Sequence, residues 1–220
     1  MTVDFGIEVR GIAEPPQHDA VVCVAKGPVG AHVGVWYDDL SGGRRALHQA
    51  WHCLFRDQAA TDRHRFTAWV VPSFDEDEAH DLGTAARKVA LSRGAGRVPY
   101  GFARRNAHFR DDGSLDLADS SGLNCSALVM MVFELASVPL LAEGTWLTER
   151  SADRESEDRA AQRTLLNELP FDQQEKLENE LGAPRVRAEE VAAASGMSGR
   201  PVRFADCAPV GAALLEQLVG

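Results

Sequence analysis

The chain has 220 residues, of which 45% are hydrophobic and 25% are charged, so it can build one sizeable core, or one core with a helical appendage. Its formal net charge of −10 repels phosphate backbones, which argues against nucleic acid as a partner and against general docking on an anionic membrane. Arg104, Arg105 and Arg110 are the best candidates for a local basic patch, although ordinary solvated arginines explain them more simply.

The chain lacks the features of a membrane or secreted protein. No apolar run approaches the roughly 20 residues that span a bilayer, so we expect no transmembrane segment. The first 17 residues have no basic stretch followed by an apolar one, as a signal peptide would. We expect a cytoplasmic protein, although a secreted effector without a cleaved signal would have the same sequence features.

The first part of the chain predicts an antiparallel sheet, because short β-branched apolar runs alternate with Gly-rich turns. Residues 1–18 indicate an irregular or edge segment, and strands are predicted over 20–26, 31–39, 46–53 and 65–72.

Alternation along two of these strands predicts the face on which each histidine lies. In the second strand His32 shares a face with Gly34 and Trp36, and in the third His48 shares a face with His52.

Two helices are predicted next. Residues 74–94 have acidic residues at the start, basic residues near the end and Gly94 after them, as the helix dipole favours. Residues 98–109 predict a connector or short strand, and 111–114 a turn. The segment 120–141 predicts a buried central helix, because its body from Cys125 onward is apolar nearly all round and Asn124 can cap it.

The remaining residues, 142–220, are much more charged. Helices are predicted over about 150–168, 171–181, 187–195 and 210–219. The predicted organisation is therefore an α+β core over residues 1–141 and a helical extension or cap over 142–220, which packs on the core or offers a surface to a protein partner.

The four cysteines, Cys23, Cys53, Cys125 and Cys207, form no CxxC pair and have no spacing typical of zinc sites. In a reducing compartment they are free thiols, and Cys23 is expected in the core. Cys125 alone is most simply a small buried thiol. Its position in the first turn of a helix has a further meaning, because the helix N-terminus stabilises a thiolate and an oxyanion.

The order of three motifs resembles a known group of enzymes. AHVGVW with His32, ALHQAW with His48 and LNCSALV with Cys125 resemble the circularly permuted papain-like thiol enzymes, which include NlpC-type peptidases and lecithin–retinol acyltransferase-like proteins. The resemblance covers residues 18–140. SALV after Cys125 departs from the acidic or aromatic pair usual in the acyltransferase branch, and residues 142–220 have no counterpart that we can place.

The resemblance implies a papain-like antiparallel sheet packed on the cysteine helix, with Cys125 as nucleophile, His32 as base and His48 as the group that orients His32. It implies a cysteine hydrolase that cleaves an amide, of peptide or cell-wall type, or an ester through an acyl-enzyme, with no cofactor. Two alternatives remain open. One is an acyltransferase or lipase, and the other is a non-catalytic interaction module that binds a partner through residues 142–220.

The other polar residues leave choices open. His52 is the alternative to His48 as the orienting group, and together with Asn124 and Ser126 it is a candidate for the oxyanion hole. A zinc site of His32, His48, His52 and Cys125 is disfavoured because no close ligand pair anchors it. Five further polar residues are expected at the surface: His64, His80, His108, Asp116 and Asp119. Asp116 and Asp119 could instead shape the mouth of the cleft.

Overall fold

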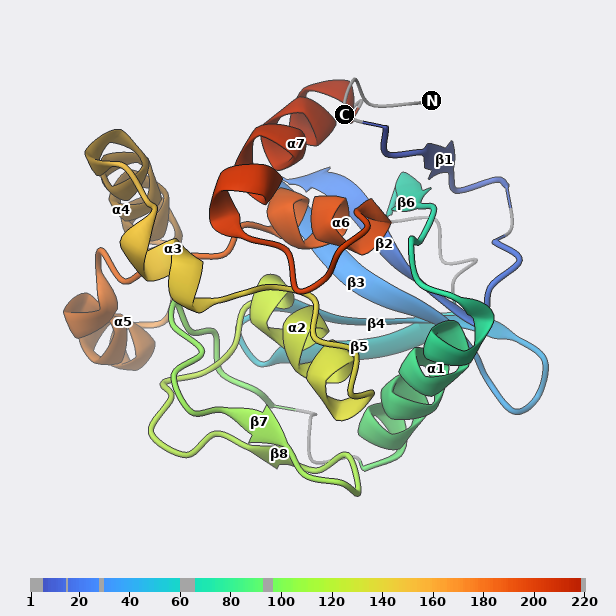
Figure 1. Cartoon of the computed structure of the whole chain (residues 1–220). Helices are drawn as coiled ribbons and strands as arrows, with labels where there is room; N and C mark the ends of the chain where they lie inside the picture. Colours follow the sequence, from blue (N-terminus) through green and yellow to red (C-terminus); the bar gives the residue numbers. More distant parts are fainter. Residues whose placement is uncertain (1–5, 15, 28–29, 60–65, 93–96, 219–220) are drawn as a thin grey trace.

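In the computed structural model, which describes residues 6–14, 16–27, 30–59, 66–92 and 97–218, an antiparallel sheet is covered by helices (Figure 1). The sheet order is β1-β6-β2-β3-β4-β5, and each neighbouring pair is antiparallel. The strands are β1 (Val9–Gly11), β2 (Ala20–Gly27), β3 (Gly30–Asp38), β4 (Arg44–Trp51), β5 (Leu54–Ala59) and β6 (Ala68–Val70), with a separate hairpin of β7 (His108–Phe109) and β8 (Leu115–Asp116).

Seven α-helices lie within the described residues, and with the sheet they confirm the expected α+β class. They are α1 (Glu76–Leu91), α2 (Cys125–Leu135), α3 (Gly144–Thr148), α4 (Ala152–Leu166), α5 (Phe171–Leu177), α6 (Ala188–Gly196) and α7 (Phe204–Gln217). No helix in the described part of the chain has the length and apolar composition needed to cross a bilayer.

The two faces of β3 serve different purposes. Val33, Val35 and Tyr37 point into the main core, where α1, α2 and α6 pack against the strand. Trp36 points to the opposite face and joins a second cluster with Phe66 and Trp69. This alternation puts His32 on the face of the sheet opposite the main core.

Helix α2 is the centre of the main core, as its sequence predicts. Every residue from Cys125 to Phe133 is buried. Asn124 begins the helix by accepting a hydrogen bond from the backbone N–H of Ala127 at 2.9 Å. The capped end therefore fixes where Cys125 lies relative to β3.

The segment 142–220 packs on the rest of the chain in two places. Helix α6 lies against β2 and β3, and its residues share the main core with those of α2. Helices α4 and α5 lie to the side (Figure 1), where their leucines enclose Tyr100 and Phe102. The interior therefore has no boundary at residue 141.

Several boundaries differ from the predictions. Strand β4 ends at Trp51, so the prediction that His52 and Cys53 belong to it is wrong; the register shifts between Gln49 and Trp51, and a turn follows. Strand β5 was missed because its sequence, LFRDQA, is largely polar. Helix α7 begins at Phe204 rather than 210, since Pro209, normally a residue of helix starts, lies inside it. Arg65 of the predicted fourth strand lies outside the described residues.

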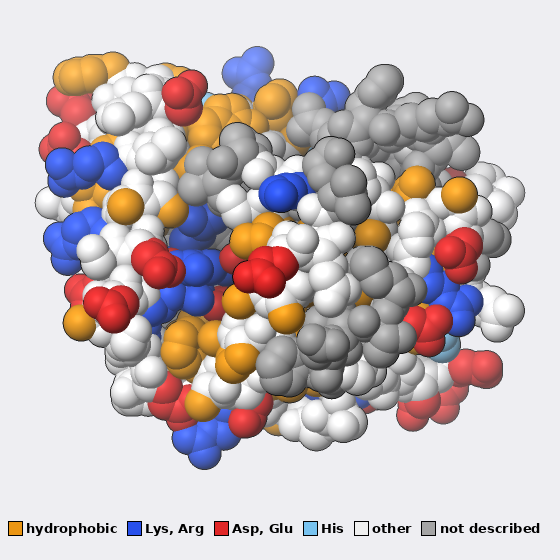
Figure 2. Space-filling view, turned by 90° about the horizontal axis from the view of Figure 1, so that it is seen from above, with side chains coloured by type: hydrophobic (Ala, Val, Ile, Leu, Met, Phe, Trp, Pro, Cys, Tyr) orange, Lys and Arg blue, Asp and Glu red, His pale blue; other side chains and the backbone are white. Residues whose placement is uncertain are grey.

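A buried ionic cluster ties α4 to α6. The Asp158 carboxylate is fully buried and contacts three guanidinium groups, those of Arg187 at 3.0 Å, Arg154 at 3.2 Å and Arg150 at 3.5 Å. Viewed from above, Arg and Lys side chains gather in a hollow on the side of α3 and α4, with acidic side chains around them (Figure 2). These charged side chains therefore join α4 to the start of α6.

We predict that Asp158→Ala lowers the free energy of unfolding by about 3–5 kcal/mol, because it removes the fully buried carboxylate that three guanidinium groups share. The matched control is Glu157→Ala, which removes an exposed partner of Arg187 and should cost less than about 1 kcal/mol. Urea denaturation followed by circular dichroism measures both. Equal losses for the two variants would show that the buried cluster has no special weight.

Candidate functional site

The site lies where β3 and β4 separate. Strands β3 and β4 are paired from Asp38–Arg44 to Val35–Leu47, and the pairing stops there. The pairing of β3 with β2 continues as far as Gly30. This leaves an open edge on β3. Along it the N–H of Ala31 donates to the Glu189 carboxylate of α6 at 3.3 Å, and the N–H of Val33 donates to the sulfur of Cys125. The first turn of α2 thus fills the gap in the sheet.

The structure brings Cys125, His32 and His48 together. The His32 ring forms a hydrogen bond with the Cys125 thiol. Its Nε2 shares a second hydrogen bond with Nδ1 of His48 at 2.8 Å, which leaves Nδ1 of His32 for the sulfur. His48 is fully buried, whereas His32 is partly exposed. The three groups therefore form a chain that runs from the helix N-terminus into the protein.

The surroundings of Cys125 favour its thiolate. Burial alone raises the pKa of the thiol, but the charge and hydrogen bond of His32, the N–H of Val33 and the charge of Arg185 outweigh it and hold the pKa below its ordinary value. Burial raises the pKa of Cys23 and of Cys207, whose backbone hydrogen bonds do not offset it and which have no histidine partner. Cys125 is therefore activated relative to these two thiols, as a nucleophile requires.

Phe66 shields the two histidines. Its ring stacks on His32 with centroids 5.4 Å apart and lies edge-on to His48 at 5.2 Å. Space for it comes from Gly34, where a Cβ atom would lie 2.8 Å from Cζ of Phe66 and 3.0 Å from Cβ of His48. An apolar ring over this hydrogen bond excludes water and strengthens it.

Two of the three candidates for the oxyanion hole, Asn124 and His52, have other partners. The Asn124 amide donates to the carbonyls of Gly101 and Phe102 and caps α2, so both ends of its side chain are engaged. Nδ1 of His52 accepts a hydrogen bond from the N–H of Tyr100 at 3.3 Å, and the structure places His48 rather than His52 against His32. Ser126 is buried on a different side of α2 from Cys125, where it lines a cavity.

The other polar residues singled out in the sequence lie away from the cysteine. His80 contacts Asp19 at 2.9 Å at the surface, and exposed His108 lies in the hairpin of β7 and β8. Asp116 pairs with Arg110, and Asp119 accepts from Asn106. The arginines of the suspected basic patch are all ion-paired, Arg104 with Glu134 and Glu143, and Arg105 with Glu180. His64 lies outside the described residues.

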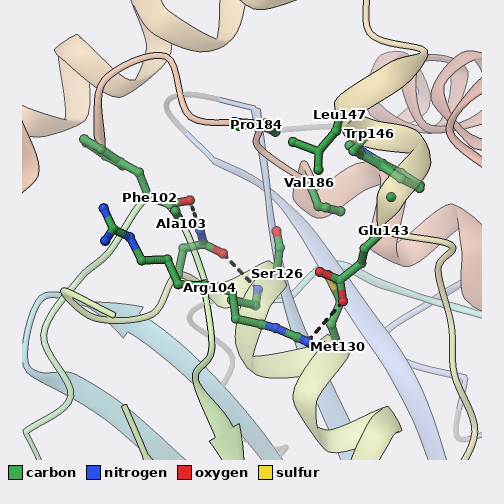
Figure 3. Close-up of a pocket in the computed structure, with 14 residues that line it drawn as sticks. Phe102, Ala103, Arg104, Ser126, Met130, Glu143, Trp146, Leu147, Pro184 and Val186 are labelled. Atoms are coloured by element: carbon green, nitrogen blue, oxygen red, sulfur yellow. Dashed lines mark hydrogen bonds and ion pairs between the residues drawn. The ribbon is translucent and has the colours of Figure 1, made fainter. Parts of the chain in front are cut away.

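A cavity of about 310 Å³ lies beside α2. Ser126 and Met130 of α2 line it on one side, and Trp146 and Leu147 of α3 line it on another, with the Arg104–Glu143 ion pair alongside (Figure 3). Ser126 and Met130 are offset from Cys125 around the helix by about 100° and 140°. The cavity is therefore on a different face of α2 from the thiol.

Three residues near the thiol were not foreseen: Phe66, Tyr100 and Arg185. Phe66 is separated from the histidines by more than a strand, and Arg185 comes from the segment expected to be an extension. Tyr100 lies in the stretch VPYG, which precedes α2 in a segment predicted to be a connector or short strand. No local pattern marks them, because their roles depend on chain segments that meet only in the fold.

The set of polar groups does not form a metal site. Among the described residues, no group of three or more His, Cys, Asp or Glu side chains is placed to hold an ion. Comparison with protein-family models, curated proteins and solved structures found no match for this chain. A functional proposal for this chain therefore rests on the geometry of the site.

We predict that alkylation of Cys125 by iodoacetamide has a pH midpoint below that of a free cysteine peptide, because His32 stabilises the thiolate. His32→Gln should move the midpoint to higher pH, since the imidazolium charge is lost. Peptide-level mass spectrometry of the rate at each pH measures this. A midpoint that is the same in both proteins would contradict the assigned cause of the shift.

We also predict that Gly34→Ala lowers the free energy of unfolding by about 1–3 kcal/mol, because the added methyl group collides with Phe66, His48 and the carbonyl of Leu47. Gly11→Ala in β1 is the control, since its Cβ would have no atom within 4 Å. Urea denaturation of both variants tests the difference. If Gly34→Ala left the stability unchanged, the packing around Phe66 and His48 would have room for the added methyl group, contrary to the structure.

Proposed function

We propose that the protein is a cysteine hydrolase that cleaves an amide, of peptide or cell-wall type, or an ester through an acyl-enzyme on Cys125. The observation that carries the proposal is the hydrogen-bonded chain Cys125–His32–His48 at the N-terminus of a buried helix. A permuted papain-like fold is part of the same proposal, since the histidine strands precede the cysteine helix and the antiparallel sheet packs on that helix.

The two hydrogen bonds of His32 define its role as the base. Nδ1 takes the proton of Cys125, and the ring then donates from both nitrogens. The N–H at Nε2 donates a hydrogen bond to Nδ1 of His48, which must be the acceptor, so the proton of a neutral His48 is on its own Nε2. His48 is thus a positioning residue that fixes the His32 ring and stabilises its charged form.

The reaction then follows acyl-transfer chemistry. The sulfur attacks the carbonyl carbon, and the backbone N–H of Cys125 with the positive end of α2 stabilises the oxyanion. His32 gives its proton to the leaving amine or alcohol as the carbon–heteroatom bond breaks. A water molecule, deprotonated by His32, next attacks the thioester, releases the acid and restores the thiol. Partial exposure of His32 supports hydrolysis, because water needs to reach its ring.

The test uses activated esters and amides, which report on a thiol enzyme before its natural substrate is identified. We predict that p-nitrophenyl esters give a burst and an acyl adduct on Cys125 in the intact-mass spectrum. Cys125→Ala and His32→Ala should lose about 10³-fold or more in turnover, and His48→Ala less than that, because it acts through His32.

Cys53→Ala is the matched control, since Cys53 is a partly exposed thiol at the end of the turn after β4. It should keep full turnover and the same adduct. Turnover that survives in Cys125→Ala, or an adduct carried by Cys53 instead, would refute the proposed nucleophile.

A further inference from the structure

The hydroxyl of Ser126 has no partner inside the described part of the protein. Only 3% of the residue is exposed, yet its side chain forms no hydrogen bond to any described residue. A buried serine in a helix can donate to a nearby carbonyl, as Ser195 of α6 does to Ala192 at 2.7 Å. Ser126 instead points from α2 toward Pro184 and Val186, into the cavity described above (Figure 3). A buried hydroxyl is nearly always hydrogen-bonded, so Ser126 calls for a polar group inside that cavity.

The charged side chains around the cavity are already neutralised. Among the described residues, those that line it are Arg104, Arg105 and Glu143. The Arg104 guanidinium lies 2.5 Å from the Glu134 carboxylate and 3.2 Å from that of Glu143, and Arg105 lies 3.6 Å from the carboxylate of Glu180. A charged ligand would lose its hydration without meeting an unpaired opposite charge. The cavity therefore favours an uncharged ligand.

The other walls of the cavity are apolar and held in place. Met130, Leu147 and Val186 contribute aliphatic side chains, and Trp146 contributes a flat ring. The indole N–H of Trp146 donates to the buried Glu190 carboxylate at 3.1 Å, so the ring cannot turn without losing that bond. Preformed apolar walls with few polar groups are typical of small-molecule sites. Apolar cavities of roughly 150 Å³ hold a benzene ring, so one of about 310 Å³ admits a body of about two rings.

We propose that this cavity binds a small neutral molecule that has an apolar body of about two rings and one hydroxyl or amide group, which forms a hydrogen bond with Ser126. The serine hydroxyl both donates and accepts, so it matches either group. Helix α2 separates the site from the thiol, because Ser126 and Met130 are offset from Cys125 around the helix by about 100° and 140°. The inference therefore goes beyond the proposed hydrolysis and does not depend on it.

The test uses three probes that share one ring system: 2-naphthol, 2-methylnaphthalene, which has a methyl group in place of the hydroxyl, and the anion 2-naphthoate. Ligand-observed NMR titrations at neutral pH measure their dissociation constants. We expect Ser126→Ala to weaken the binding of 2-naphthol about fivefold, because one hydrogen bond is lost, and to leave that of 2-methylnaphthalene unchanged. In the wild-type protein 2-naphthoate should bind more weakly than 2-naphthol.

Leu147→Ser tests the apolar wall, because Leu147 is 69% exposed at the rim and can change without unfolding the core. It should weaken both neutral probes about threefold. Leu91→Ser is the matched control, since Leu91 is an exposed leucine of α1 at a different hollow, and it should change neither. Binding should also persist in Cys125→Ala.

Four results would overturn the inference. They are no saturable binding of 2-naphthol to the wild-type protein, an equal effect or no effect of Ser126→Ala on the two neutral probes, tighter binding of 2-naphthoate than of 2-naphthol, and loss of binding in Cys125→Ala. The last result would place the probe in the cleft of the thiol.

Discussion

The open edge of β3 is the constraint on which the rest of the site depends. Once β3 and β4 separate beyond Val35 and Leu47, backbone N–H groups of β3 need acceptors other than a strand. Glu189 accepts from Ala31, and the sulfur of Cys125 accepts from Val33. A thiolate satisfies this second position better than a thiol, because it is the stronger acceptor. The same break in the sheet lets α2 approach the plane of the strands, so that a histidine on the far face reaches the cysteine.

The helices after residue 141 support this arrangement from two directions. Helix α6 supplies the Glu189 carboxylate and part of the core under β3. Helix α5 holds the loops beside the site, since the Gln173 amide donates to the carbonyls of Tyr100 and Ser121. These two loops meet at Gly101 and Gly122, where a Cβ on Gly101 would lie 2.4 Å from the carbonyl oxygen of Gly122. The charged C-terminal segment is therefore a structural part of the site.

Local signals predicted the elements that carry the chemistry. The runs AVVCVAK and AHVGVWYDD, rich in β-branched residues, gave strands close to the observed β2 and β3, and the apolar run after Asn124 gave α2. Their alternation also placed His32 opposite Val33 and Val35. Strand β5 escaped because its stability comes from pairing with β4 and not from its own apolar residues. On an unbroken strand His48 was preferred to His52 only because it lies nearer the strand centre, and the irregularity after Gln49 separates the two.

The sequence by itself determined which residue types stand at the starts and faces of the elements: a cysteine after a helix cap, and histidines on consecutive strands. Those features follow from local preferences, which act over a few residues. Tertiary structure alone decided that the strand ends before His52 while His48 contacts His32, and that Phe66 covers both rings. These contacts join segments far apart along the chain, so they depend on the break between β3 and β4 and on packing that no local pattern encodes.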